Sequence, residues 1–299
     1  AHRLVEGFSR QVAERELAGA QAGLGDRFRV EILQQQAAAW RKAGRRLSLN
    51  AVRDAAGTII SDPVVASRFL QAHWQEVFSK RDIDEDAADK AISLTTTFCQ
   101  SHCWDIKVDW FLHILTSSKS SAPGPDGIPY SAYKAVKEVA APILHEAFMF
   151  YRDGRPLPSG FNDSLLVFIP KGEDTLNDIN GTTARTPANT RPISLSNTDN
   201  KVFSGAINHV LAAATSAVIG QYQQGFIRGR SIVHQVVALD GYASLWARLY
   251  HKDLAVILFD IVAAFPSLNH NFIFRTLQHR GLPEPLVEFI RKLYDHVLS

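Results

Sequence analysis

The chain has 299 residues, of which 46% are hydrophobic and 21% charged, and its formal net charge is +2 at pH 7. This composition is typical of a globular protein and excludes a disordered tail. No apolar run reaches the roughly 18 residues that would predict a membrane span. The charge is nearly balanced, so any basic surface for nucleic acid must be local. Two cysteines, Cys99 and Cys103, are too few for a zinc site without distant ligands.

The N-terminal part of the chain predicts helices, and we expect residues 1–115 to form a mainly helical extension or connector. Asp62 followed by Pro63 is typical of a helix start, because the Asp side chain can cap the first turn and proline fits its first position. The predicted elements lie over residues 1–50, 63–78, 84–97 and 108–115. The segment 84–97 is either a helix or a polar linker.

The rest of the chain, residues 116–299, predicts a second domain of helices with a few strands. It opens with a loop over 117–127 that is dense in Ser, Pro and Gly. The apolar runs 165–169 and 254–259 are too short for helices, which predicts strands. Long helices that alternate irregularly with few strands indicate an α+β fold. The helices are predicted over residues 130–151, 198–219, 231–250, 269–279 and 285–298.

Both ends of the sequence have the pattern of cuts in a longer polypeptide. The chain begins at Ala1 without a methionine or a signal-peptide pattern. It ends at Ser299, inside a segment that still has the pattern of an amphipathic helix. We therefore expect the chain to be part of a longer protein.

Asp260 is the first candidate for chemistry, because it follows the predicted strand 254–259 at its C-terminal end, where side chains emerge from a sheet into a cleft. A carboxylate there is well placed to bind a hard divalent cation such as Mg²⁺. By spacing alone, a helix-capping Asp is the favoured alternative. Ala264 and Phe265 follow closely and could form the floor beneath a nucleotide sugar, although a core aromatic is the plainer interpretation of Phe265.

Two further groups of residues are candidates for binding phosphate. Lys171 follows the first predicted strand and Arg191 opens the segment 191–195, so pairing of the two segments as a hairpin would bring both cations to one side, where a triphosphate could bind. Isolated surface cations are the commoner alternative. The second group combines glycine, an aromatic residue and two arginines, which suits contact with a sugar-phosphate chain or, equally, a turn into a helix. Its candidates are Gln223, Gly225, Arg228 and Arg230.

Four segments in this order resemble the motifs of reverse transcriptases from non-LTR (LINE-like) retroelements. Any one match is weak, but their order and separation are specific, and they cover roughly residues 117–299. Upstream, residues 49–78 are loosely similar to the connector that precedes the polymerase in these elements. The four segments are Ala122-Pro-Gly-Pro-Asp-Gly-Ile128; Phe168-Ile-Pro-Lys171 with Arg191-Pro-Ile-Ser-Leu195, Asp199 and Lys201; Gln223-Gln-Gly-Phe-Ile-Arg-Gly-Arg230; and Phe259-Asp-Ile-Val-Ala-Ala-Phe-Pro-Ser-Leu-Asn-His270.

The resemblance implies the fingers and the first part of the palm of a right-hand polymerase, preceded by the helical extension. It implies RNA-directed DNA polymerase activity in a retrotransposon, with an RNA template, a DNA primer, deoxynucleoside triphosphates and Mg²⁺, or Mn²⁺ in its place, as partners and cofactor. Asp260 and the Ile261 carbonyl would bind metal. Lys171 and Arg191 would close on the triphosphate, and Phe265 would exclude a ribose 2′-hydroxyl.

The sequence departs from the family pattern in three ways. Pro266 stands where many members have a second aspartate, the segment between Lys171 and Arg191 is long, and no aromatic-x-Asp-Asp motif follows Asp260. One carboxylate cannot position two divalent ions, so we expect residues 1–299 to be inactive alone. The alternative function is a non-catalytic remnant that binds RNA, and a third interpretation is an unrelated helical protein with chance matches. The family also implies nuclear or ribonucleoprotein-associated action.

Overall fold

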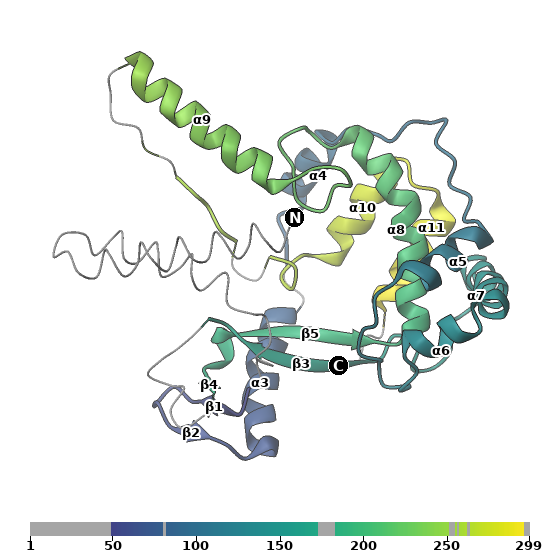
Figure 1. Ribbon diagram of the computed structural model, residues 1–299, viewed down its shortest axis with the longest axis horizontal. Helices are drawn as coiled ribbons and strands as arrows, with labels where there is room; N and C mark the ends of the chain where they lie inside the picture. Colours follow the sequence, from purple (N-terminus) through teal and green to yellow (C-terminus); the bar gives the residue numbers. More distant parts are fainter. Residues whose placement is uncertain are drawn as a thin grey trace, which may run out of the picture. The chain divides into compact units, whose positions relative to one another are not determined.

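The computed structural model describes residues 49–79, 82–172, 183–250, 255, 257–261 and 264–295. Leu49–Ser299 form one unit of the chain, and its mixture of helices and short strands (Figure 1) confirms the α+β prediction. The helical segment predicted over residues 1–48 lies outside the described residues. The boundary predicted between residues 115 and 116 falls inside helix α5, Val108–Ser117, and the division into two domains stays a prediction.

A small three-stranded sheet holds the first described residues. Strands β1 (Ala51–Arg53) and β2 (Ile59–Ile60) pair antiparallel, and β4 (Ala184–Arg185) pairs parallel with β1. The turn between β1 and β2 uses Gly57 at φ +86°, which glycine adopts without steric cost. Helix α3 (Pro63–Phe78) follows, capped by the Asp62 side chain as predicted.

The second sheet is a two-stranded hairpin formed by β3 (Ser164–Pro170) and β5 (Thr190–Ser196). The strands pair antiparallel with Leu165 opposite Leu195 and Ile169 opposite Arg191. A short 3₁₀ turn, η2 (Pro187–Asn189), precedes β5. The indole nitrogen of Trp74 on α3 donates to the Thr190 hydroxyl at 3.1 Å, which ties the hairpin to α3. The predicted pairing of these two segments is therefore confirmed.

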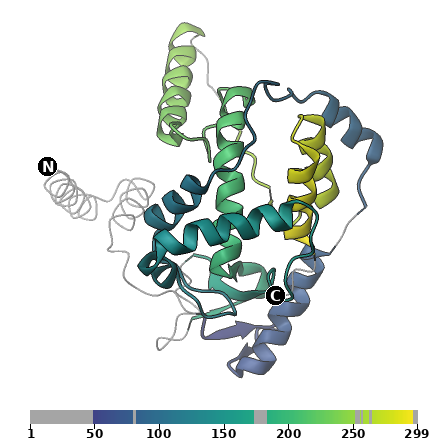
Figure 2. The ribbon, with the colours of Figure 1, turned by 90° about the vertical axis from the view of Figure 1, so that its right-hand side faces the viewer.

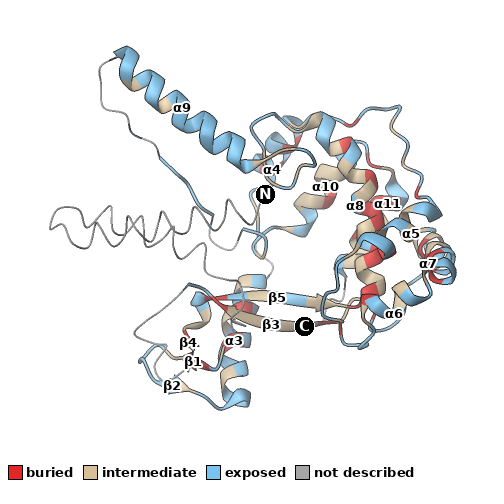
Figure 3. Cartoon of the chain, in the orientation of Figure 1, coloured by how far each residue is buried: buried red, intermediate tan, exposed pale blue. Residues whose placement is uncertain are grey.

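The hydrophobic core lies among the helices. Phe111 on α5, Phe148 on α7 (Lys137–Arg152), Phe203 on α8 (Thr198–Val218) and Phe289 on α11 (Glu284–Tyr294) are fully buried. The rings of Phe148 and Phe289 meet edge-on with their centroids 4.8 Å apart, an arrangement that favours aromatic pairs. Figure 2 shows α7 crossing α8, and buried residues run along α8 in Figure 3.

The remaining helices are attached to this core to different degrees. Helix α10 (His270–His279) packs on α11 and on α4 (Glu85–Ser93), with Arg275 forming ion pairs to Glu85 and Asp89. Helix α6 (Tyr130–Ala135) is separated from α7 at Val136, so the single helix predicted over 130–151 is two helices. Helix α9 (Ile232–Tyr250) has no buried residue, which is visible as a pale helix in Figure 3.

The strand predicted over 254–259 is wrong for the residues described there. Residues 257–260 have no regular secondary structure, and Ile257, Leu258 and Phe259 are exposed. A single segment gains little from extended conformation unless a neighbouring strand satisfies its backbone donors and acceptors. In the two sheets above, no described strand pairs with this run.

Candidate functional site

The β3–β5 hairpin carries the two predicted phosphate-binding cations. Arg191 lies directly opposite Ile169 in the register, and Lys171 is two residues beyond Ile169. Lys171 and Arg191 therefore lie at the same end of the hairpin. Both residues are exposed. The hairpin therefore presents two cations to solvent at one end, and their binding of a triphosphate stays a prediction.

Arg185 fixes the backbone beside Lys171, and sequence reasoning did not find it. Its side chain is almost completely buried, with a relative exposure of 4%. The guanidinium donates to the carbonyl oxygens of Lys171 at 3.2 Å and Gly172 at 3.0 Å, and the Lys171 N–H donates to the Asn189 carbonyl at 2.8 Å. A buried arginine needs such acceptors to offset its lost hydration. The position of Lys171 is thus held from two sides.

The Ala122–Ile128 motif packs against the junction of β5 and α8. The Lys201 ammonium donates to the Ala122 carbonyl at 2.8 Å, and the Asp126 N–H donates to the Asn197 side-chain oxygen at 3.2 Å. Gly124 passes so close that a β-carbon there would lie 2.4 Å from the Asn197 nitrogen. Two motifs far apart in sequence are therefore joined, and both lie next to the hairpin strand β5.

Asp199 lies in this junction with its carboxyl partly withdrawn from water. Burial raises the pKa of Asp199 above its ordinary value, and the nearby negative charge of Asp126 raises that pKa further, against the hydrogen bond from the Asn200 N–H. The raised pKa means that this carboxyl takes up a proton more readily in the folded protein than in the unfolded chain. Ionisation of Asp199 at neutral pH therefore opposes folding.

We expect Asp199→Asn to raise the free energy of unfolding at pH 7. A carboxyl whose pKa is raised by folding contributes stability at pH values below its unfolded pKa of about 3.9, and that contribution is lost as pH rises through the folded pKa. The advantage of Asn should therefore shrink as pH falls toward 4. Urea unfolding at pH 7 and pH 4 measures this gain in unfolding free energy. Asp240→Asn, on exposed helix α9, is the control. An advantage that stays equal at both pH values would contradict the assignment.

The segment from Gln223 to Arg230 forms a loop at the C-terminal end of α8. Arg230 donates to four backbone carbonyls there, including those of Gly220 at 2.6 Å and Ile219 at 3.0 Å. This is the ordinary chemistry of a cation at a helix C-terminus. Gln223 donates to the Gly225 carbonyl at 3.1 Å. Arg228 is exposed. Nucleic-acid binding by the four residues stays a prediction.

Asp260 and Ile261 are both exposed in the described structure, at the end of the run that lacks its predicted strand. Ile261 and Ala264 line a cavity of about 490 Å³ against Ala87 of α4 and Phe272 of α10. Phe265 is 79% exposed, so it is not a core aromatic. Its ring meets that of Phe226 edge-on at 6.1 Å between centroids. The structure therefore brings Phe265 to the Gln223–Arg230 loop.

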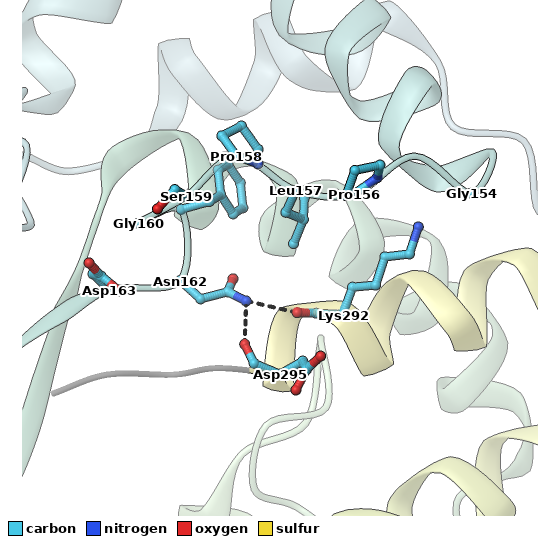
Figure 4. Close-up of a pocket in the computed structure, with 11 residues that line it drawn as sticks. Gly154, Pro156, Leu157, Pro158, Ser159, Gly160, Asn162, Asp163, Lys292 and Asp295 are labelled. Carbon is cyan, nitrogen blue, oxygen red and sulfur yellow. Dashed lines mark hydrogen bonds between the residues drawn. The ribbon is translucent and has the colours of Figure 1, made fainter.

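A second cavity, of about 690 Å³, lies between the loop after α7 and the end of α11 (Figure 4). Its wall includes Leu157 and Asp163, and the Asn162 amide donates to the carbonyls of Lys292 and Asp295, both at 2.7 Å. None of the residues predicted from the sequence as site residues lines it. It is a separate feature of the fold.

The described residues do not assemble a metal site. No group of three His, Cys, Asp or Glu side chains among them could hold an ion. Asp260 offers one carboxylate, which does not fit two divalent ions. In the same part of the chain, no helix is both long and apolar enough to cross a membrane.

Comparison with known proteins identifies the class to which this arrangement belongs. Residues 169–299 match the family described as reverse transcriptase (RNA-dependent DNA polymerase). The match begins at the end of β3, beside Lys171, and includes β5, the Gln223–Arg230 loop and Asp260. Residues 169–299 thus belong to the reverse transcriptase family.

The similar proteins narrow the class to one kind of genetic element. The chain is 23% identical over 259 residues, 85% of its length, to the "Transposon TX1 uncharacterized 149 kDa protein" of Xenopus laevis. It is 25% identical over 235 residues, 77% of its length, to the "Retrovirus-related Pol polyprotein from type-2 retrotransposable element R2DM" of Drosophila melanogaster. The chain covers 19% and 20% of these relatives. It carries a reverse transcriptase domain of the non-LTR retroelement type.

Proposed function

We propose that the protein containing this chain is an RNA-directed DNA polymerase, which adds deoxynucleotides to a DNA primer while copying an RNA template. The family match over residues 169–299 is the observation that carries the proposal. The hairpin adds independent support, because Lys171 and Arg191 are both exposed at one end of it. Lysine supplies a point charge and arginine a planar fork of donors, a combination that suits a triphosphate.

Within this proposal, residues 116–299 correspond to the fingers and the first part of the palm of the polymerase, and residues 1–115 to a helical extension before them. Lys171 and Arg191 bind the triphosphate, and Ala264 and Phe265 lie beneath the sugar, where Phe265 excludes a ribose 2′-hydroxyl. Asp260 and the Ile261 carbonyl are ligands for Mg²⁺, or for Mn²⁺ in its place. Further ligands are needed, because one carboxylate does not hold two ions.

Residues 1–299 are proposed to lack polymerase activity on their own, because their one candidate carboxylate does not hold two metal ions. After Asp260 the sequence has no aromatic-x-Asp-Asp motif. A second candidate function is a remnant that binds RNA without copying it, which the same basic hairpin and exposed loop would suit. The two functions differ in whether the native protein extends a primer.

Primer extension on an RNA template distinguishes them. The native polypeptide that contains this chain should extend a labelled DNA primer when deoxynucleotides and Mg²⁺ are present, and chelation by EDTA should stop it. Residues 1–299 should bind the primer–template without extending it. Binding without extension by both proteins would favour the remnant, and robust extension by residues 1–299 would contradict the proposed need for further carboxylates.

A further inference from the structure

Phe226 combines two unfavourable properties that folding alone does not explain. It is 96% exposed, so its ring gains almost nothing from burial. Its backbone has φ +62°, and among the described residues it is the one non-glycine with positive φ. Bulky side chains are rare there because the β-carbon crowds the backbone. Strain of this kind persists where the surrounding structure holds it, and it clusters at functional sites.

The surrounding loop does hold this conformation. Arg230 anchors the loop to the end of α8 through three carbonyl oxygens and donates to the loop's own Gln223 carbonyl as well. The Gln223 side chain donates to the Gly225 carbonyl, immediately before Phe226, and the Arg230 N–H donates to the Ile227 carbonyl at 3.1 Å. The strained residue therefore stands between two anchored points. Its ring is presented to solvent by a fixed loop.

The residues beside Phe226 are of the types found in sites that bind nucleobases. The Phe265 ring meets it at 6.1 Å between centroids and 89° between planes. An edge-on contact braces one ring against the other and leaves ring faces available, because the two rings do not stack on each other. Arg228 is exposed two residues away. Aromatic faces beside an arginine are the usual means by which proteins bind unpaired bases and the phosphates between them.

We infer that Phe226 is a stacking residue for an unpaired base of single-stranded RNA, braced by Phe265. The inference rests on the proposed function and goes beyond it, since it assigns base contact to a residue outside the predicted phosphate and sugar contacts. A protein partner is less suited to this surface, because the polar residues Gln223, Gln224 and Arg228 lie within three residues of Phe226 in the sequence. An RNA base accepts such surroundings, because its edges are polar.

The test uses the full 299-residue chain and a single-stranded RNA 12-mer that carries one 2-aminopurine base. Stacking quenches 2-aminopurine fluorescence, which a purely structural role for Phe226 would not produce. Phe226→Leu keeps an apolar side chain but removes the aromatic face, so we expect it to weaken RNA binding about 5- to 30-fold and to abolish the quenching. Phe226→Trp should restore both. Phe150→Leu, at an exposed phenylalanine on α7, is the matched control and should change neither.

The variant Phe226→Gly tests whether the phenylalanine is needed for RNA binding or for stability of the fold. Glycine adopts positive φ readily, so this variant should melt at the same temperature as the wild type or higher, yet bind RNA as weakly as Phe226→Leu. If the wild type binds RNA and Phe226→Leu shows the same affinity and the same quenching, the inference about Phe226 is overturned, while the proposed function is not. A wild-type chain that binds no RNA would overturn both the inference and the proposed function. A loss of melting temperature in Phe226→Gly would show that Phe226 acts in folding, against the inference.

Discussion

Replacing Asp260 with alanine is expected to reduce primer extension by the native polypeptide at least about 1000-fold, at the upper end of the loss from removing one charge-stabilising group in an active site. The proposed role places this carboxylate in direct contact with a catalytic cation, for which no neutral side chain substitutes. In the described structure Asp260 is exposed. Its removal should therefore change the free energy of unfolding by no more than about 0.5 kcal/mol.

Steady-state extension rates and urea unfolding together measure this prediction. Asp153→Ala is the matched control, because Asp153 is an exposed carboxylate at the end of α7 whose ion pair with Arg152 is at the surface and worth little. It should leave the extension rate unchanged. Near-normal nucleotide addition by Asp260→Ala would remove Asp260 from the site. A large loss of stability would instead assign it to the fold.

Gly124→Ala is expected to destabilise the fold by about 3 kcal/mol, the upper part of the range for overpacking a close contact. The added β-carbon would lie 2.4 Å from both the nitrogen and the side-chain oxygen of Asn197, and 2.5 Å from the Ser196 carbonyl carbon. Two of these atoms are backbone, at the point where β5 ends and α8 begins. They cannot move aside without disturbing that junction.

Gly127→Ala in the same loop is the matched control. Gly127 has φ +70°, and a β-carbon added there would meet no atom within 4 Å. Alanine at this position therefore introduces backbone strain of about 1 kcal/mol without a clash. Urea unfolding should place Gly124→Ala well below Gly127→Ala in stability. Equal losses in the two variants would mean that the loop does not pack against the β5–α8 junction as described.

The parts of the fold that local sequence determines were predictable. Asp62 before Pro63 predicted the start of α3, and the Asp62 side chain caps it. The apolar run 165–169 predicted a strand, and its pairing with the segment 191–195 was a stated possibility that the structure confirms, because the length of an apolar run and its flanking residues are local properties. The Gln223–Arg230 segment was also identifiable, since its glycines and arginines are unusual at that density.

The parts that depend on distant partners were not predictable. The run 254–259 has the composition of a strand, but composition does not state whether a neighbouring strand pairs with it. Arg185 gave no signal, because its burial comes from pairing of β4 with β1, far upstream. The break at Val136 divides one apolar pattern into two helices. Phe226 was part of a quoted motif, yet its positive φ could not be inferred from residue types.

The two anchors on the Lys171 backbone have a consequence for binding. The main chain is fixed on one side by Asn189 and on the other by Arg185, while the ammonium donates to the Ala188 carbonyl at 2.8 Å at the surface. An arriving anion would exchange one acceptor of the ammonium for another and need not reorganise the peptide chain. The entropy cost of orienting Lys171 is incurred during folding. Binding of an anion would therefore not carry that cost again.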